Sequence, residues 1–319
     1  MNKPIYLVHT DEYKNWIFDP THPTQGRRFS NARDLLTAAA KEKGLDLVEV
    51  LPRPATEAEL LRVHTSDYID EVLNQHLSSE WEGERADLAN LARLFVGGTL
   101  TALDALLTDK TKLAIHFPGA KHHAQADHSS GFCVFNDFAI AADIATKDYG
   151  LRVAILDIDA HHGDGVENLT KGNHNVITFS IHQGGIFPGT GYESEAGDFY
   201  NIPLEDGAGD EELLDAIDQF ISVFGASDRI WNWQPDLLFI TCGADGHSED
   251  PLTGLAYSVA GYVAAAKKVR ERFPDLPILL GGAGGYLPDT RTPEVWSNVA
   301  ISLANRPATA DKIHLSLLP

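Results

Sequence analysis

The chain has 319 residues, of which 43% are hydrophobic and 22% charged, so it can bury a large apolar core. Its 46 acidic and 25 basic residues give a formal net charge of −21, which excludes nucleic-acid binding through a general basic surface. No apolar run approaches the ~20 residues that a membrane span needs, and the N-terminus lacks a signal-peptide pattern. The chain has only two cysteines and therefore no disulfide framework, which indicates a reducing compartment. We expect a cytoplasmic protein.

Short apolar runs alternate with helical periodicities along the chain. A first strand is predicted within residues 1–10, and strands buried on both faces at 112–117, 153–158, 176–181, 237–241 and 278–280. Helical patterns occupy residues 30–43, 88–107, 137–147, 210–224 and 258–273. This alternation indicates an α/β fold with one parallel β-sheet covered by helices on both faces. We expect a single domain over residues 1–319, with the polar stretch 77–88 as an exposed loop.

Four of these strands run into segments that are rich in ionisable residues or glycine. The strands end near Phe117, Ile158, Thr241 and Leu280. Binding sites in sheets of this kind form in the loops beyond the carboxyl ends of the strands. We therefore expect the functional site in these four loops.

The densest of the four segments is residues 155–165, which read ILDIDAHHGDG. On an extended chain Asp157, Asp159 and His161 point to one side. Aspartate and histidine suit a divalent metal such as Zn²⁺, and a catalytic site uses three protein ligands and one open position. A polar loop of caps and turns explains one aspartate but not five ionisable groups in eight residues. We interpret the segment as a metal or catalytic site.

A third metal ligand is expected from the loop after another strand. Asp245 lies three residues beyond the end of the strand LLFITC, and its position favours a ligand over a turn residue. Asp250 precedes Pro251, and we interpret it as a turn residue.

Two histidines, His122 and His123, follow the strand AIHF and the turn Pro118–Gly119. Adjacent side chains on an extended chain diverge, so the two rings are poorly placed to bind one ion. They are either general acid–base groups or a pair on a surface loop, and the residues alone leave both interpretations open. Asp157 and Asp164 are available as carboxylate partners.

Two further segments contain glycine, GFCVFND at 131–137 and GGAGGY at 281–286. The second delivers Tyr286 on a loop with almost no side chains, where backbone can approach a ligand closely. A phenol in such a place can donate a hydrogen bond to a developing oxyanion. Neither segment has the spacing of a phosphate-binding loop, so phosphate binding is not favoured.

Six motifs together carry a resemblance to a known family. PGAKHHA, GFCVFND, DIDAHHGDGVE, FPGTG, CGADxxxxDPL and GGAGGY occur in the order and spacing of the histone deacetylase family. The chain resembles that family from about His22 to Tyr286, including its bacterial acetoin-utilisation and acetylpolyamine amidohydrolase-like members. The resemblance implies the arginase–deacetylase fold and hydrolysis of an N-acyl amide. The implied substrates are an acetylated amine, a polyamine or acetyl-lysine.

The resemblance also assigns roles to individual residues of this sequence. It makes Asp159, His161 and Asp245 the ligands of one Zn²⁺, or of Fe²⁺ in its place. Tyr286 becomes the residue that polarises the amide carbonyl. The tandem histidines become catalytic groups, each with a carboxylate partner: His122 with Asp157, and His123 with Asp164.

Other residues are implied to surround the substrate. The resemblance makes Phe132 and Phe187 the walls of an acyl-lysine tunnel and Gly131 its floor, although Phe usually packs in a core. It places Leu252 and Glu82 at the rim of the tunnel, and Arg28 in an inner acetate channel. A surface salt bridge is the simpler role for that arginine. A structural K⁺ is implied at backbone carbonyls and one hydroxyl of Asp157, Asp159, His161, Ser180 and Ile181.

Two alternatives to a deacetylase compete with this interpretation. A two-metal ureohydrolase uses Asp-x-His-x-Asp and Asp-x-Asp, but Gly163 and Gly243 stand where its second metal needs carboxylates. A non-enzymatic acyl-lysine or metal-binding module would normally have lost Tyr286 or a histidine, and both are present. The sequence at 22–25, His-Pro-Thr-Gln in place of the commoner His-Pro-Glu-Arg, predicts a different entrance loop.

Overall fold

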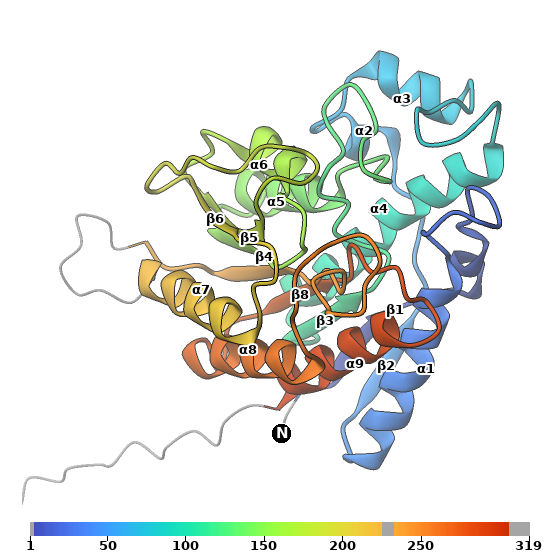
Figure 1. Ribbon diagram of the computed structural model, residues 1–319. Helices are drawn as coiled ribbons and strands as arrows, with labels where there is room; N and C mark the ends of the chain where they lie inside the picture. Colours follow the sequence, from blue (N-terminus) through green and yellow to red (C-terminus); the bar gives the residue numbers. More distant parts are fainter. Residues whose placement is uncertain (1–2, 225–232, 306–319) are drawn as a thin grey trace, which may run out of the picture.

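The computed structural model describes residues 3–224 and 233–305, and in these residues eight strands form one sheet (Figure 1). In chain order the strands are β1 (Ile5–Val8), β2 (Leu47–Val50), β3 (Leu113–His116), β4 (Val153–Asp157), β5 (Val176–Gln183), β6 (Phe199–Leu204), β7 (Leu237–Thr241) and β8 (Ile278–Gly281). Their order across the sheet is β2-β1-β3-β8-β7-β4-β5-β6, and all neighbours are parallel. Parallel neighbours need crossover connections, most of which contain helices.

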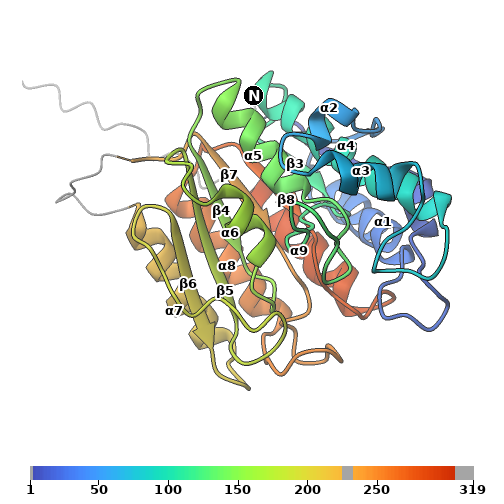
Figure 2. The ribbon, with the colours of Figure 1, turned by 90° about the horizontal axis from the view of Figure 1, so that it is seen from above.

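Two layers of helices cover the faces of the sheet (Figures 1 and 2). In one layer, neighbouring helices pack in the order α1 (Arg27–Glu42), α9 (Arg291–Ala304), α8 (Val259–Arg272) and α7 (Asp210–Val223). The other layer contains α4 (Ala86–Leu107), α5 (Asp137–Lys147) and α6 (Asp164–Thr170), with α2 (Glu57–Leu60) and α3 (Ser66–Leu73) at the α4 end. A 3₁₀ turn, η1 (Asp11–Asn15), follows β1. The predicted α/β fold, a parallel sheet with both faces covered, is confirmed.

The central strands are buried throughout and mostly apolar because helices cover both of their faces. Every residue of β3, β4, β7 and β8 is buried. Burying one aliphatic side chain contributes about 1.5–3 kcal/mol, so this block supplies much of the stability on which the site rests. Side-chain caps begin two of the covering helices: Asn136 accepts a hydrogen bond from the Ala139 N–H before α5, and Ser258 accepts one from the Gly261 N–H before α8.

The sequence predicted the buried strands and the long helices, but it missed elements at the edges. β2 and β6 were not predicted, because edge strands are only partly buried and lack a continuous apolar run. β6 also contains Pro203, which is tolerated there because its strand lies at the edge. α9 was missed too, and its Pro293 lies in the first turn, where proline does not interrupt the helix.

The four strands that lead into the chemical segments are neighbours in the sheet. β3, β8, β7 and β4 are adjacent in that order. Their last residues are in register, with Gly281 paired to both His116 and Thr241, and Thr241 paired to Asp157. The four loops therefore begin at one level on the carboxyl edge of the sheet, as expected for a shared site.

The polar stretch 77–88, expected to be an exposed loop, forms a loop over residues 77–85 with mostly exposed residues, but Trp81 within it is buried. Its indole N–H donates to the carbonyl of His76, and its ring lies 6.3 Å from that of Phe18. The surrounding charged residues gave no sign in the sequence that this tryptophan is buried.

In the described part of the chain, no helix is long and apolar enough to cross a membrane.

Candidate active site

Three side chains that could hold a metal ion meet in the loops after β4 and β7. The ligand atoms of Asp159, His161 and Asp245 all lie within 4.8 Å of one another. His161 Nδ1 is 3.1 Å from Asp159 Oδ1 and 3.0 Å from Asp245 Oδ2. Both carboxylates are buried, and buried carboxylates are costly without a nearby positive charge. The predicted third ligand therefore lies beside the other two, in an arrangement that suits a divalent ion.

Glycine residues make room for these carboxylates. A Cβ at Gly243 would lie 2.5 Å from Asp159 Cγ, and a Cβ at Gly284 would lie 2.6 Å from Asp159 Oδ2. The Gly284 N–H also donates to Asp159 Oδ2 at 2.7 Å, and the Ala160 N–H donates to Asp245 Oδ1 at 3.0 Å. The glycine-rich segment before Tyr286 therefore packs against the triad itself. A carboxylate in place of Gly243, as a second metal would require, has no space here.

The electrostatics of the triad favour a positive charge at its centre. Burial alone would lower the pKa of His161, but its hydrogen bonds to Asp159 and Asp245 and their charges raise it to about 11. Burial opposes ionisation of Asp159, yet the neighbouring imidazoles lower the pKa of this carboxyl well below its usual range. The site therefore needs a cation, either a proton on His161 or a divalent ion in its place.

The tandem histidines are buried, each against its own carboxylate. His122 Nδ1 lies 2.7 Å from Asp157 Oδ2, and His123 Nδ1 lies 2.7 Å from Asp164 Oδ1. The two ring centroids are 4.0 Å apart, and each residue is only 3% exposed. The alternative of a surface loop pair therefore does not fit. With Nδ1 donating to a carboxylate, the Nε2 atom of each ring is the acceptor in the neutral form.

The environments of the two histidines shift their pKa values in opposite directions. Burial would lower the pKa of His122, but the charges of Asp157 and Asp159 raise it to about 9. Burial and the positive charge of His122 lower the pKa of His123 to about 4, against the opposing effect of Asp164. At neutral pH His122 is protonated, and His123 is neutral and able to accept a proton.

Asp137, which sequence analysis had placed only as the start of a helix, holds the loop before these histidines. Its buried carboxylate accepts from the N–H groups of Ala120, at 3.0 Å, and Lys121, at 2.7 Å. The hydroxyl of Thr99 also bonds to it, and that hydroxyl lies 2.9 Å from Nδ1 of His116. An acidic residue at the start of a helix is common for dipole reasons, so this positioning role had no distinct signal in the sequence.

Tyr286 lies half-buried beside the triad, with its backbone fixed by Asp250. Its N–H donates to Asp250 Oδ2 at 2.8 Å, and the other oxygen of Asp250 accepts from the Leu252 N–H at 3.0 Å. Asp250 is therefore more than the turn residue that the sequence indicated. Burial, and then the charges of Asp245 and Asp159, raise the pKa of the phenol well above its usual value. The phenol stays protonated and remains a hydrogen-bond donor.

Arg28 is 2% exposed, so a surface salt bridge does not describe it. Its Nη1 donates to the carbonyl of Gly285 at 2.6 Å. Its guanidinium carbon lies 5.0 Å from the ring of Phe29 and 5.4 Å from that of Trp296. The Arg28 side chain thus holds the backbone of the loop that carries Tyr286.

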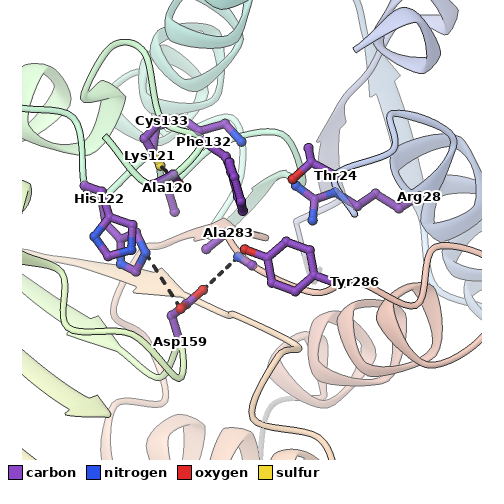
Figure 3. A pocket seen from close by; sticks show the side chains of 13 residues that line it. Thr24, Arg28, Ala120, Lys121, His122, Phe132, Cys133, Asp159, Ala283 and Tyr286 are labelled. Atoms are coloured by element: carbon purple, nitrogen blue, oxygen red, sulfur yellow. Dashed lines mark hydrogen bonds and ion pairs between the residues drawn. The ribbon is translucent and has the colours of Figure 1, made fainter. Parts of the chain in front are cut away.

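A pocket with ≈ 300 Å³ of space, part of it open to solvent, is lined by Asp159, the tandem histidines, Tyr286 and Arg28 (Figure 3). Phe132 forms part of its wall, and the centroid of its ring lies 6.1 Å from that of Tyr286. Gly131 forms part of its floor. A Cβ at Gly131, where φ is +56°, would lie 2.8 Å from His123 Cγ and 3.0 Å from Phe187 Cε1. Phe187 is 49% exposed and its ring lies 5.0 Å from that of His123, so core packing does not account for it.

Near the predicted rim, the two glutamates Glu80 and Glu82 differ in burial. Glu82 is exposed, whereas Glu80 on the same loop is half-buried and accepts from the Phe132 N–H at 2.9 Å. The structure thus places Glu80, rather than Glu82, against the pocket wall, and the acidic run hid which glutamate turns inward. Leu252 is 42% exposed at the predicted rim.

The residues of the predicted K⁺ site are brought together by the sheet. β4 and β5 pair with Asp157 opposite Ser180, and Ile181 follows on the same strand. Asp159 and His161 lie on the loop just after β4. The Ser180 hydroxyl lies 2.9 Å from Nδ1 of His182.

Comparison with known proteins gives one consistent result. Residues 22–303 match the histone deacetylase domain. The acetoin utilization protein AcuC of Staphylococcus aureus (strain MRSA252) is 31% identical over 334 residues, covering 96% of this chain and 83% of that protein. AcuC of Bacillus subtilis (strain 168) is 33% identical over 322 residues, covering 93% and 81% respectively. AcuC of Staphylococcus xylosus is 29% identical over 330 residues, covering 95% and 83%.

Proposed function

The chain belongs to the histone deacetylase family, and on that premise we propose that it is a metal-dependent deacetylase acting on linear N-acyl amides. The proposed substrates are acetyl-lysine, acetylated amines and acetylated polyamines, and the proposed catalytic domain is the single domain of residues 1–319. The observation that supports this best is the meeting of a ligand triad, two histidine–carboxylate pairs and a protonated phenol around one pocket.

Asp159, His161 and Asp245 are the proposed metal ligands. Their buried carboxylates and single imidazole supply the hard and borderline donors that Zn²⁺ prefers, and Fe²⁺ accepts the same set. Three protein ligands leave one side open to the reactants. When bound, such an ion lowers the pKa of water and polarises a carbonyl oxygen.

His123 is the proposed proton carrier. Its neutral Nε2 accepts a proton from the attacking water, and the same nitrogen then delivers it to the leaving amine. Asp164 holds the Nδ1 side of this ring and fixes its orientation. His122, protonated through its contact with Asp157, stabilises negative charge beside it.

Tyr286 is the proposed oxyanion donor. Its phenol stays protonated because burial and the triad carboxylates disfavour the phenolate. A fixed donor of this kind stabilises the carbonyl oxygen as it becomes negative. Asp250 and Arg28 act as positioning residues, because each holds the backbone next to the tyrosine.

The remaining predicted residues shape the approach of the substrate. Phe132 and Phe187 flank the acyl-lysine chain above Gly131, with Leu252 and Glu82 at the rim. A K⁺ bound through Asp157, Asp159, His161, Ser180 and Ile181 would stabilise the loop after β4 from below.

The test is turnover of an acetyl-lysine peptide by the purified protein before and after treatment with a chelator. We expect activity to disappear with the metal and to return on adding Zn²⁺ or Fe²⁺. Asp127 and His128 form an exposed histidine–carboxylate pair at 2.7 Å, so Asp127→Asn serves as a control that should change nothing. Undiminished turnover in metal-free protein would remove the proposed mechanism.

A further inference from the structure

Gln125 is a polar residue near the active site that the proposed chemistry does not use. It follows His123 by two positions and is not among the residues that line the pocket. Its Nε2 donates at 2.9 Å to Oδ2 of Asp164, whose other oxygen lies 2.7 Å from Nδ1 of His123. A side-chain amide therefore holds the free oxygen of the carboxylate that orients the proposed proton carrier.

The second oxygen of each carboxylate determines how firmly its histidine is held. The terminal torsion of an aspartate is only weakly restricted, so one hydrogen bond alone leaves the carboxylate free to turn. In the His122 pair, Asp157 Oδ1 accepts from the backbone N–H of Asp159 at 2.9 Å. In the His123 pair, the corresponding oxygen accepts from the Gln125 side chain. The support of the proton carrier therefore depends on a side chain and can be removed by one substitution.

The main chain of Gln125 is fixed on both sides. Its N–H donates to the carbonyl of His128 at 3.0 Å, and its carbonyl lies 2.9 Å from Nδ1 of His64. Nε2 of that buried ring accepts from the Asn136 N–H at 2.9 Å, so the neutral imidazole carries its proton on Nδ1 and donates it to Gln125. Burial lowers the pKa of His64 to about 4, which keeps the ring neutral. The amide thus projects from an anchored backbone.

The surroundings also determine which end of the Gln125 amide faces Asp164. Its Nε2 faces two acceptors, Asp164 Oδ2 and the carbonyl of His123, the latter at 3.2 Å. Its Oε1 accepts from Nδ2 of Asn168 at 3.1 Å. Turning the amide over would direct an oxygen at a carboxylate and a carbonyl, neither of which can donate. Asn168, Gln125 and Asp164 therefore form a chain of hydrogen bonds that runs in one direction and ends at His123.

We propose that Gln125 is a positioning residue for proton transfer, which acts on His123 through Asp164. This inference rests on the proposed deacetylase function and goes beyond it, because it makes the chemical step depend on a residue outside the substrate pocket. Hydrogen bonds to a charged acceptor are stronger than those between neutral groups, and a small misplacement of a catalytic group lowers turnover. Loss of the Gln125 amide should therefore lower kcat and leave KM nearly unchanged.

Two substitutions separate the hydrogen bond from the packing of the side chain. Gln125→Met keeps a similar length and volume but has no N–H, whereas Gln125→Lys keeps a donor. We expect Gln125→Met to lower kcat for an acetyl-lysine peptide roughly tenfold or more, the usual effect of one hydrogen bond to a charged group. KM should stay within about twofold, because no substrate contact is removed. Gln125→Lys should retain at least about three times the kcat of Gln125→Met.

Gln75 supplies a matched control. Its Nε2 donates to Asp70 Oδ2, also at 2.9 Å, but both residues are exposed and neither lines the pocket. Gln75→Met therefore removes a glutamine–aspartate hydrogen bond of the same length without reaching the site. Its kcat, KM and metal content should equal those of the wild type.

Asn168→Asp tests the direction of the hydrogen-bond chain. The new carboxylate would face Oε1 of Gln125 and favour the turned amide, with its oxygen toward Asp164. We expect kcat to fall about threefold or more in the wild-type background and to stay unchanged in the Gln125→Met background, a coupling that a double-mutant cycle measures. The added negative charge alone would act in both backgrounds, so an equal fall in both contradicts the chain.

Proton NMR of the histidine side chains follows the same contact without turnover. The Nδ1–H resonance of His123 is identified by its absence in His123→Ala. We expect this proton to exchange with solvent at least about tenfold faster in Gln125→Met than in the wild type or in Gln75→Met. The measurement decides the role of Gln125 even if no acyl peptide is hydrolysed, a result that would contradict the proposed function alone.

An unchanged kcat in folded Gln125→Met would overturn the role of Gln125 and leave the deacetylase proposal intact. An equal loss of kcat in Gln125→Lys would also contradict it, because packing and not the hydrogen bond would then be responsible. If Gln125→Met does not fold, the other two variants decide. A lower kcat in Asn168→Asp with a nearly normal kcat in Gln125→Lys supports the proposal, and an unchanged kcat in Asn168→Asp contradicts it.

Discussion

The two ends of the active-site pocket carry opposite charge. At the triad, the carboxylates of Asp159 and Asp245 lie beside the imidazole of His161 and favour a cation. Away from the triad, Arg28 and Lys121 line the same pocket, and the Arg28 Nε has no hydrogen-bond partner among the described residues. The separation is built by topology, because the acidic residues follow β4 and β7 while the basic ones come from α1 and the loop after β3.

This difference in charge indicates that the two ends have different roles. The acidic end contains the residues that could hold a metal ion and lies beside the two histidine–carboxylate pairs, and glycines pack closely against it. At the basic end, Lys121 lies over the rings of Trp16 and Phe95, and the buried Thr24 hydroxyl and Arg28 Nε have no hydrogen-bond partner among the described residues.

The largest effect is expected for Tyr286→Phe, which removes one hydroxyl at the acidic end and keeps the ring. Turnover of acetyl-lysine should fall by roughly 10²–10³-fold, the usual loss for an oxyanion donor. Metal content and the affinity for a hydroxamate should change little, because the phenol is not one of the ligand atoms. Near-normal turnover in this variant would leave the tyrosine as a packing residue and require the mechanism to be withdrawn.

The next effect concerns Gly131, at the floor of the pocket. Gly131→Ala should lower turnover roughly tenfold or more, because the new methyl would press on His123 and Phe187. Gly150→Ala is the matched control: its φ of +66° imposes the same backbone cost of about 1–2 kcal/mol, but nothing lies within 4 Å of the added atom. Equal losses of turnover in both variants would mean that strain, and not contact with the histidine, causes the effect.

The pH profile separates the two histidines. Turnover requires His123 neutral and His122 protonated, so it should rise with pH through about 4 and fall as pH rises through about 9. Asp157→Asn removes the charge that holds the proton on His122, so the falling limb should move to lower pH by about one unit or more. The profile is measured as kcat/KM across pH, with Asp127→Asn as control. An unmoved limb would show that His122 does not set it.

The smallest effect comes from the overall charge. With a net charge of −21, acetyl-lysine peptides with basic flanking residues should react a few-fold faster than acidic ones at low salt. The preference should fade as salt rises, since the Debye length is about 10 Å at 0.1 M. Equal specificity constants for the two peptides at low salt would restrict the role of the charge to solubility.

Sequence reasoning reached the fold and the triad for identifiable physical reasons. Buried parallel strands leave continuous apolar runs, and their carboxyl ends bring distant segments together, which placed Asp245 beside Asp159. The edge strands β2 and β6 are only partly buried and contain no continuous apolar run, so the sequence did not predict them.

The residues that were missed act through contacts that only the folded chain creates. Asp137 reads as an ordinary helix start, yet it fixes the backbone before the histidines. Glu80 and Glu82 look alike in an acidic run, and only packing turns Glu80 toward Phe132. Lys121 resembles a surface lysine in the sequence, but the rings of Phe29 in α1, Phe95 in α4 and Trp16, just after η1, surround its ammonium.

The central claim is tested most directly by metal stoichiometry together with turnover in Asp245→Asn. The wild type should bind one divalent ion per chain and hydrolyse acetyl-lysine, and the variant should lose both, because one of the two carboxylates among the three ligands is gone. Asp218→Asn, which breaks only an exposed contact with Lys268, should retain both. Full metal occupancy and turnover in Asp245→Asn would contradict the account.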